Sequence, residues 1–164
     1  MKSLFSHTFI QSHKRGFTLL LAALVSSIAL SLGAAIFSLA QKEVILASLS
    51  KSSQFAFYAA DTASECALYW DIRYSYFATS TPPGVTPTCD GTTLAISSAL
   101  PTYPYTQNFE FEPNGYCADV AVTKSIDPVS GALKTLIHAD GYSTPCATKL
   151  TSDQALQRSV ELNY

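Results

Sequence analysis

The sequence predicts an α+β fold in which one long hydrophobic N-terminal helix packs on a small antiparallel β-sheet. The first observation is an uninterrupted apolar run over residues 17–40. The second is a change of pattern after residue 89, where apolar and polar residues begin to alternate in short segments. The third is composition, because only 13% of the 164 residues are charged, against ~25% in ordinary soluble domains. Together these observations indicate a helical stem followed by one small globular head.

Residues 1–16 form a short basic leader ahead of the apolar run. The leader contains Lys2, Lys14 and Arg15 and no acidic residue. Basic residues that flank an apolar helix stay in the cytoplasm, so we expect the C-terminal part to be exported. Without the leader the chain has seven basic and twelve acidic residues. This acidic balance argues against a specific nucleic-acid surface, which needs clustered Lys and Arg.

The apolar run has the dimensions of a membrane-spanning and assembly helix. Residues 17–40 are 24 residues without a charge. At ~1.5 Å per residue such a helix covers ~36 Å, enough for the ~30 Å hydrocarbon core of a bilayer. Small residues recur along it at spacings of four, which lets neighbouring helices approach closely in lipid. These sets are Ala22/Ser26, Ser27/Ser31/Ala35, Ala29/Gly33 and Ala34/Ser38.

The junction between leader and helix reads Lys14-Arg15-Gly16-Phe17-Thr18-Leu19-Leu20. This segment resembles the prepilin signal of type IV pilins and pseudopilins, in which Gly precedes the cut and Phe is the first mature residue. The resemblance implies that a prepilin peptidase cuts between Gly16 and Phe17 and methylates the new N-terminus, while the apolar helix stays on the protein. Glycine suits such a cut, because the missing Cβ lets the backbone of a protease approach closely.

Two other interpretations of the junction stay open. Gly16-Phe17 could be an incidental dipeptide ahead of an uncleaved signal anchor. Alternatively, a signal peptidase could cut after Ser38-Leu39-Ala40, which has the small-residue form of its sites. The length of the apolar run exceeds the ~7–15 residues of an ordinary signal sequence, which favours the prepilin interpretation.

The fifth residue after the expected cut is Leu21, where most members of the resembled family carry a glutamate. In that family the buried acid attracts the free amino group of the neighbouring subunit during assembly. A carboxylate in hydrocarbon is costly unless it is paired, so it is kept where the pair is needed. A subunit that leads a filament has no earlier neighbour, which suggests a minor, initiating or tip subunit. The alternative is a branch of the family that assembles by packing alone.

Residues 41–77 are expected to continue the helix as the amphipathic second half of the stem. No Pro or Gly interrupts residues 42–70. One face is spaced by three or four residues and is expected to pack on the sheet, and residues 55–60 are expected to be mostly core. The packing face is Phe55, Ala59, Thr62 or Ala63, Cys66 and Trp70, and the opposite side carries Lys51, Gln54, Asp61 and Glu65.

Residues 78–164 are expected to form the antiparallel head. A loop rich in Pro and Thr over residues 79–89 ends the helix. Short alternating segments then predict strands, with a hairpin turn over residues 127–131 that has Pro and Gly at suitable positions. The predicted strands are residues 92–97, 108–112, 117–124, 133–139 and 158–164.

Four cysteines, Cys66, Cys89, Cys117 and Cys146, lie in the part expected to be exported. An even number of cysteines in a small exported domain favours disulfides. No C-x-x-C pair is present and His138 is the one histidine after the leader, so a zinc site has little support. Three pairings are possible, and we favour Cys66–Cys89 with Cys117–Cys146 because each closes a loop within one half of the head.

No catalytic, cofactor or metal motif is found in the sequence, and we expect the chain not to be an enzyme. His138 falls in a strand, where a surface or core position is the ordinary role. Glu110 and Glu112 share a strand face and are expected to be solvated rather than to bind a cation. Asp127 and Asp140 are expected to flank turns and to accept backbone hydrogen bonds.

The expected function is structural, as a minor pilin or pseudopilin in a type IV pilus-like filament. Expected partners are the prepilin peptidase, other pilin subunits through the N-terminal helix, and the inner-membrane assembly platform. The chain would span the cytoplasmic membrane once with its C-terminus outside, and then enter an extracytoplasmic filament. Tyr103 and Tyr105 could add adhesive surface, although aromatic residues in a small head are more often core or filament contacts. The alternative is a membrane-anchored extracytoplasmic binding protein that does not polymerise.

Overall fold

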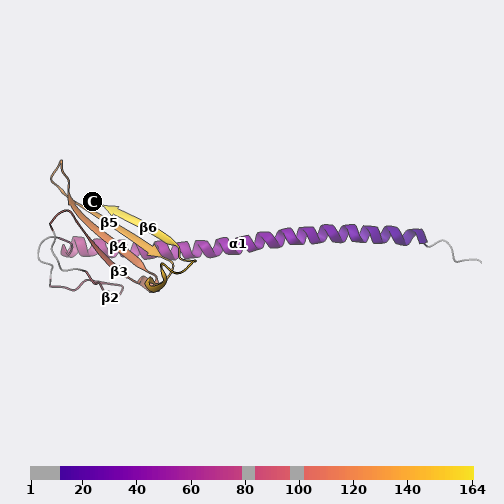
Figure 1. The fold of residues 1–164 in the computed structure, drawn as a ribbon, viewed down its shortest axis with the longest axis horizontal. Helices are drawn as coiled ribbons and strands as arrows, with labels where there is room; N and C mark the ends of the chain where they lie inside the picture. Colours follow the sequence, from indigo (N-terminus) through magenta and orange to yellow (C-terminus); the bar gives the residue numbers. More distant parts are fainter. Residues whose placement is uncertain (1–11, 79–83, 97–101) are drawn as a thin grey trace, which may run out of the picture. The chain divides into compact units, whose positions relative to one another are not determined.

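The computed structural model describes residues 12–78, 84–96 and 102–164 (Figure 1). The chain divides into two compact units, Met1–Ala47 and Ser48–Tyr164. In its described part the first unit is helical, and the second unit contains the rest of the same helix and all the strands. The elements are α1 (Ser12–Tyr74), β1 (Thr88–Cys89), β2 (Thr92–Thr93), β3 (Tyr105–Phe111), η1 (Pro113–Gly115), β4 (Ala118–Ile126), β5 (Leu133–Tyr142), η2 (Cys146–Thr148) and β6 (Gln157–Asn163).

Strands β3, β4, β5 and β6 form a four-stranded antiparallel sheet in that order. Each strand pairs with the next one along the chain, so the sheet is a meander. The second half of α1 packs on this sheet (Figure 1), which confirms the predicted α+β fold. Four of the five predicted strands coincide with members of the sheet. In the segment 92–97, residue 97 lies outside the described residues, and of residues 92–96 only Thr92 and Thr93 form a strand, β2.

The β4–β5 hairpin turns over residues 127–131, as predicted. The Asp127 carboxylate accepts hydrogen bonds from the backbone N–H groups of Val129 (2.8 Å) and Ser130 (2.9 Å). Gly131 adopts φ 68°, a left-handed conformation that glycine takes at little cost. The same prediction for Asp140 is wrong. Asp140 lies within β5, and its carboxylate accepts a side-chain hydrogen bond from Ser159 on β6.

Small residues set the contact between α1 and the sheet. Ala56, Ala60, Ala63 and Ala67 are completely buried on one face of the helix. Gly141 on β5 faces them so closely that an added Cβ would lie 2.0 Å from the carbonyl oxygen of Ala56. The close approach of helix and sheet therefore depends on the absence of a side chain at residue 141.

Two expectations about aromatic residues are corrected. Within residues 55–60, Ala56, Ala59 and Ala60 are buried as expected, but Phe57 is 46% and Tyr58 is 62% exposed, so these two rings are not core. A helix has ~3.6 residues per turn, so Ala56 and Ala60 lie on the same face, toward the sheet. The intervening residues Phe57 and Tyr58 point in other directions, and their rings are left exposed. Tyr105 is buried on the helix side of β3 and therefore adds nothing to an adhesive surface.

Helix α1 ends at Tyr74, slightly before the expected boundary at residue 77. Ser75 adopts φ 50°, and its N–H donates to the carbonyl oxygen of Asp71 at 2.9 Å. This is the left-handed form of C-terminal cap, in a position where glycine is more usual. The chain then turns back so that Phe77 is completely buried and its ring stacks near that of Phe109.

Candidate functional site

The expected processing bond lies near the start of α1. The backbone is helical from residue 12, so Lys14, Arg15, Gly16 and Phe17 are consecutive helical residues. The Phe17 side chain is 68% exposed, and a Cβ added at Gly16 would meet no atom within 4 Å.

The apolar part of α1 that follows is exposed along its whole length. Every residue from 17 to 50 is exposed, and the large hydrophobic side chains include Leu24 at 51% and Ile36 at 67% exposure. By length and composition this helix can cross a membrane. The hydroxyl groups of Ser27, Ser31 and Ser38 donate to backbone carbonyls three residues earlier. They therefore bring no unpaired hydroxyl into an apolar environment.

Leu21 lies within this exposed helix and is itself 50% exposed. Residues 17–40 contain no ionisable side chain at all. A neighbouring amino group would therefore find no carboxylate along this stretch. Any contact between this stretch and another helix would therefore use uncharged residues alone.

In the second unit, a buried ion pair joins α1 to the sheet. Lys124 Nζ on β4 lies 2.5 Å from Asp71 Oδ2, and each side chain is only 5% exposed. Lys124 Nζ also donates to Thr135 Oγ1 at 2.8 Å, and Tyr164 Oη donates to Asp71 Oδ2 at 2.6 Å. Burial, together with the hydrogen bond to the Asp71 carboxylate, raises the pKa of Tyr164. All four side chains are therefore held in one hydrogen-bonded cluster.

Local sequence patterns do not predict this cluster. One feature of the sequence does indicate that Lys124 is buried. In β4 every second residue points to the core, and Lys124 follows this alternation from Ala118, Val120 and Val122. A lysine at a core position of a strand needs an anionic partner. Its partner, Asp71, follows the buried Trp70 on the helix, but nothing in the local sequence connects the two residues.

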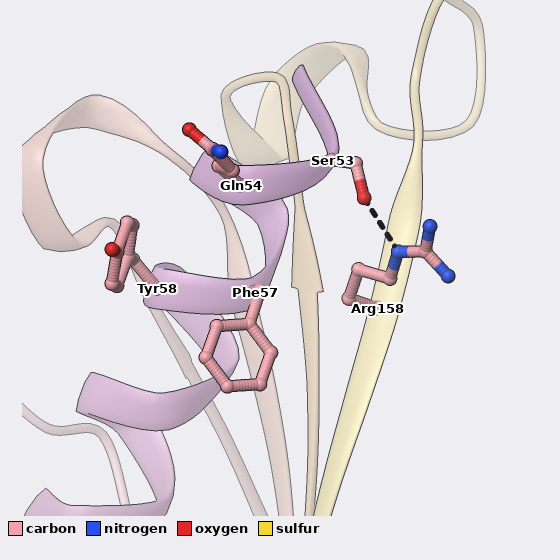
Figure 2. A pocket seen from close by; sticks show the side chains of 5 residues that line it. All are labelled: Ser53, Gln54, Phe57, Tyr58 and Arg158. Carbon is pink, nitrogen blue, oxygen red and sulfur yellow. Dashed lines mark hydrogen bonds between the residues drawn. The ribbon is translucent and has the colours of Figure 1, made fainter. Parts of the chain in front are cut away.

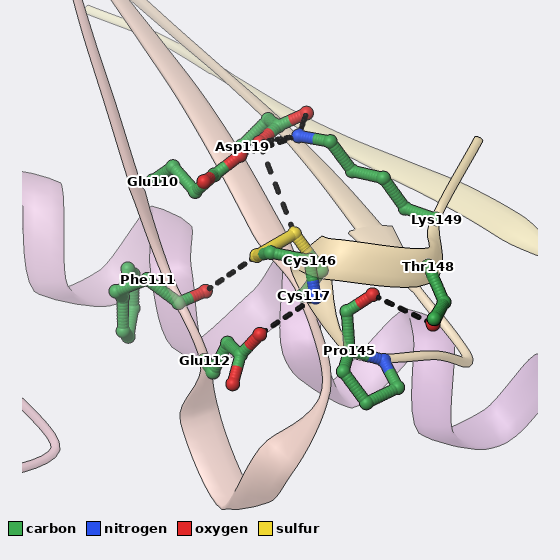
Figure 3. The surroundings of a disulfide bond; sticks show 9 residues. All are labelled: Glu110, Phe111, Glu112, Cys117, Asp119, Pro145, Cys146, Thr148 and Lys149. Carbon is green, nitrogen blue, oxygen red and sulfur yellow. Dashed lines mark hydrogen bonds and ion pairs between the residues drawn. A yellow bond between two sulfur atoms is a disulfide. The ribbon is translucent and has the colours of Figure 1, made fainter. Parts of the chain in front are cut away.

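The Cys117–Cys146 disulfide anchors the loop after β5 (Figure 3). Next to it, Lys149 Nζ contacts Glu110 Oε2 at 2.5 Å and Asp119 at 2.6 Å. Glu112 Oε1 accepts a hydrogen bond from the backbone N–H of Cys146 at 2.7 Å. Lys149 lowers the pKa of Glu110. Glu110 and Glu112 are thus not simply solvated, as the sequence suggested, because both fasten this loop.

The second disulfide joins Cys66 on α1 to Cys89 on β1. Beside it, Trp70 Nε1 donates to the carbonyl oxygen of Thr88 at 3.0 Å. With Cys117–Cys146, this gives the two pairings favoured from the sequence, and no cysteine is free. The sulfur atoms of Cys117 and Cys146 lie near the Glu110 carboxylate, but both belong to a disulfide and are not available as thiolate ligands.

His138 lies on the face of the sheet away from α1 and is 42% exposed. Its Nε2 is 3.3 Å from Asp140 Oδ1 and its Nδ1 is 3.4 Å from Glu161 Oε2. These contacts place a histidine between two carboxylates on neighbouring strands. The His138–Glu161 contact is a cross-strand pair between β5 and β6, and such pairs stabilise a sheet modestly.

Comparison of this sequence with protein-family models, with curated proteins and with solved structures finds no match.

Proposed function

We propose that this chain is a subunit of a type IV pilus-like filament, made as a membrane-anchored precursor and cut between Gly16 and Phe17. One observation carries the proposal. The Lys14-Arg15-Gly16-Phe17 junction stands immediately before an exposed, uncharged helix that continues in the chain into a disulfide-bonded antiparallel head. Each part has a role in such a subunit.

The exposed helix explains why the subunit would need two environments. An apolar surface of this length is not stable in water, so lipid or other apolar helices must cover it. In the membrane, acyl chains would cover residues 17–40. In a filament, the same residues of neighbouring subunits would replace the lipid, and the small residues at spacings of four would allow close packing.

The charge boundary supports the place of the cut. Lys14 and Arg15 would hold the leader on the cytoplasmic side, which puts the Gly16–Phe17 bond at that face of the membrane. A prepilin peptidase acting there would remove the leader and leave the helix in place. The partners of the mature chain would then be other pilin subunits and the inner-membrane assembly platform.

Leu21 supports a minor, initiating or tip position over the repeating shaft. A subunit without an acid at this position cannot offer a carboxylate to the amino group of a neighbour. Counting copies in purified, sheared filaments by quantitative mass spectrometry tests this part. A few copies per filament are expected, and thousands of copies would contradict the tip position while leaving the pilin proposal intact.

Mass spectrometry of the mature N-terminus tests the proposal as a whole. We expect the chain to begin at N-methylated Phe17 and to occur in the sheared filament fraction. The Gly16→Val variant should keep the leader, whereas the matched control Gly33→Val, in the middle of the same helix, should be cut normally. An intact Met1 would favour a signal anchor or a non-polymerising receptor, and a start at Gln41 would show signal-peptidase cleavage. Either result would overturn the proposal.

A further inference from the structure

Strand β6 is an open edge of the four-stranded sheet. Among the described strands it pairs only with β5, in a continuous antiparallel register. Just beyond this register, Thr135 and Tyr164 exchange both backbone hydrogen bonds. Because bonded pairs alternate along an antiparallel ladder, the N–H and C=O groups of every second residue of β6 point away from β5. These residues are Gln157, Ser159, Glu161 and Asn163.

One charged side chain controls which strand can pair with this edge. Edges are usually protected by a proline, a bulge or a charge that points inward. Strand β6 contains no proline, and its register with β5 has no bulge. Its inward charge is Arg158, which lies on the α1 side of the sheet and donates from Nε to Ser53 Oγ at 2.8 Å. An edge charge of this kind rejects any strand that cannot satisfy it.

Arg158 has no acidic partner in the described part of the chain. Residues 78–164 contain four basic side chains, Arg158 and three lysines. Each lysine forms an ion pair: Lys124 with Asp71, Lys134 with Asp127, and Lys149 with Glu110 and Asp119. Figure 2 shows the two terminal nitrogen atoms of Arg158 pointing away from Ser53. A guanidinium group presents these donors in a planar fork that fits a carboxylate.

The space beside Arg158 can take a side chain from an incoming strand. A shallow pocket of about 380 Å³ lies between α1 and β6 at this arginine (Figure 2). Besides Arg158, its lining includes Ser53 and the rings of Phe57 and Tyr58, which are 46% and 62% exposed. The pocket therefore combines a cation held by a hydrogen bond with aromatic surface that can cover the carbon atoms of the incoming side chain.

The remainder of β6 defines the rest of the partner. Val160 and Leu162 follow Arg158 on the α1 side and are only half-buried, although they pack against the core. Apolar side chains opposite them would complete their burial. We propose that the β6 edge binds an extended segment of a different protein, with a carboxylate opposite Arg158 and apolar side chains opposite Val160 and Leu162. The segment pairs antiparallel, as all neighbours in this sheet do, so it reads apolar–x–apolar–x–acid.

A second copy of β6 does not meet these requirements. Opposite residues of an antiparallel pair point to the same side of the sheet. On the α1 side β6 carries Arg158, Val160 and Leu162, followed by Tyr164, so two paired copies would leave both arginines without a carboxylate. The partner is therefore another chain. For its identity as a neighbouring subunit, met once by this minor subunit, the inference rests on the proposed filament function.

Binding of a peptide to the purified full-length chain in detergent tests the proposal. The probe is the fluorescent peptide Thr-Val-Thr-Val-Thr-Glu-Thr, and a version with lysine in place of the glutamate is its control. Arg158→Glu should lose the acidic peptide about tenfold or more and should gain affinity for the basic one. Arg73→Glu makes the same charge change at an exposed arginine near the end of α1 and should bind like the wild type.

Three results of this experiment would overturn the proposal. They are the absence of binding of the acidic peptide to the wild type at millimolar concentration, an equal loss in the Arg158 and Arg73 variants, and an unchanged preference for the acidic peptide in Arg158→Glu. Anisotropy of the fluorescent peptide measures all three.

A proline variant separates strand pairing from attraction between charges. Ser159→Pro removes an N–H that points away from β5, so the ladder between β5 and β6 keeps its hydrogen bonds. We expect this variant to bind the acidic peptide about tenfold more weakly or worse. Ser159→Ala loses the same side-chain contact with Asp140 but keeps the N–H, and it should bind like the wild type. Equal binding by the two variants, both folded by circular dichroism, would show that the peptide does not extend the sheet.

Photo-crosslinking in sheared filaments tests the identity of the partner. A benzophenone amino acid replaces Asn163 on the edge, and Leu150, which is 85% exposed on the loop after η2, is the control position. We expect adducts only from position 163, on a segment of another subunit with the apolar–x–apolar–x–acid pattern. Adducts that map to this same chain would overturn the inference. Peptide binding needs no filament, so its failure contradicts the inference alone, whereas an intact Met1 contradicts the proposed function alone.

Discussion

Asp71 near the C-terminal end of α1 and Lys124 on β4 form a salt bridge across 2.5 Å in the interior of the head, with each side chain 5% exposed. The pair joins the helix to the sheet, which are the two layers of the fold. A buried charge without its partner is strongly destabilising, so the pair also fixes how far α1 can shift along the sheet. Tyr164 also belongs to this cluster, because its hydroxyl group donates a hydrogen bond to the Asp71 carboxylate.

We predict that Asp71→Ala destabilises the head by about 3–5 kcal/mol, because it leaves the Lys124 ammonium buried and unpaired. Denaturant unfolding of the full chain in detergent measures the effect. Lys134→Ala is the matched control, since it removes a lysine that is 56% exposed and should change stability by about 1 kcal/mol or less. The double variant Asp71→Leu/Lys124→Met should recover much of the loss, and a double variant as unstable as Asp71→Ala would contradict this account.

A second prediction concerns the closest contact between helix and sheet. Gly141→Ala would place a Cβ 2.0 Å from Ala56 O and 2.4 Å from Ala60 N, both backbone atoms that cannot move independently. We expect a loss of about 3 kcal/mol or more, at the upper end of what overpacking costs. Resistance to a protease measures it. Gly84→Ala, where a Cβ meets no atom within 4 Å, should behave like the wild type, and equal behaviour of the two variants would exclude the close contact.

The two disulfides give a third prediction. They join residues 23 and 29 positions apart, and closing loops of that length stabilises a fold by about 3–4 kcal/mol. We expect Cys117→Ser/Cys146→Ser and Cys66→Ser/Cys89→Ser each to lose stability of this order. Peptide mapping without reduction should find the linked pairs Cys66–Cys89 and Cys117–Cys146, and any cross-pairing between them would contradict the structure.

The hairpin turn gives a prediction about pH. Lys134 forms an ion pair with Asp127, and the N–H groups of Ser130 and Val129 donate hydrogen bonds to its carboxylate. These contacts hold the pKa of Asp127 well below its usual range. A carboxyl whose folded pKa is lowered stabilises the fold above its unfolded pKa of about 3.9, and this contribution is lost as pH falls below that value. Asp127→Asn keeps an acceptor but removes the charge. The urea concentration at the midpoint of unfolding should fall between pH 7 and pH 3 in both proteins, but by less in the variant than in the wild type. An equal fall in the two proteins would show that Asp127 does not contribute to this pH dependence.

The sequence by itself determined the layout of the chain. A long apolar run without charge is stable when lipid or other apolar helices cover it. Strict alternation of apolar and polar residues places one side of a strand in the core. Both patterns can be recognised from neighbouring residues in the sequence. The apolar helix, the antiparallel sheet after it and the turn at residues 127–131 were all predicted in this way, whereas one of the five predicted strands is not a member of the sheet. The junction at Gly16 and Phe17 is likewise a local signal.

Only the tertiary structure decided which distant residues meet. Asp71 and Lys124 are separated by 53 positions and Gly141 and Ala56 by 85, and no local pattern connects either pair. Periodicity placed Phe57 and Tyr58 within an apolar run, but only the position of the sheet against the alanine face left their rings outside. The reason is physical: periodicity fixes the direction of a side chain relative to its own element, whereas its partners depend on how the elements pack.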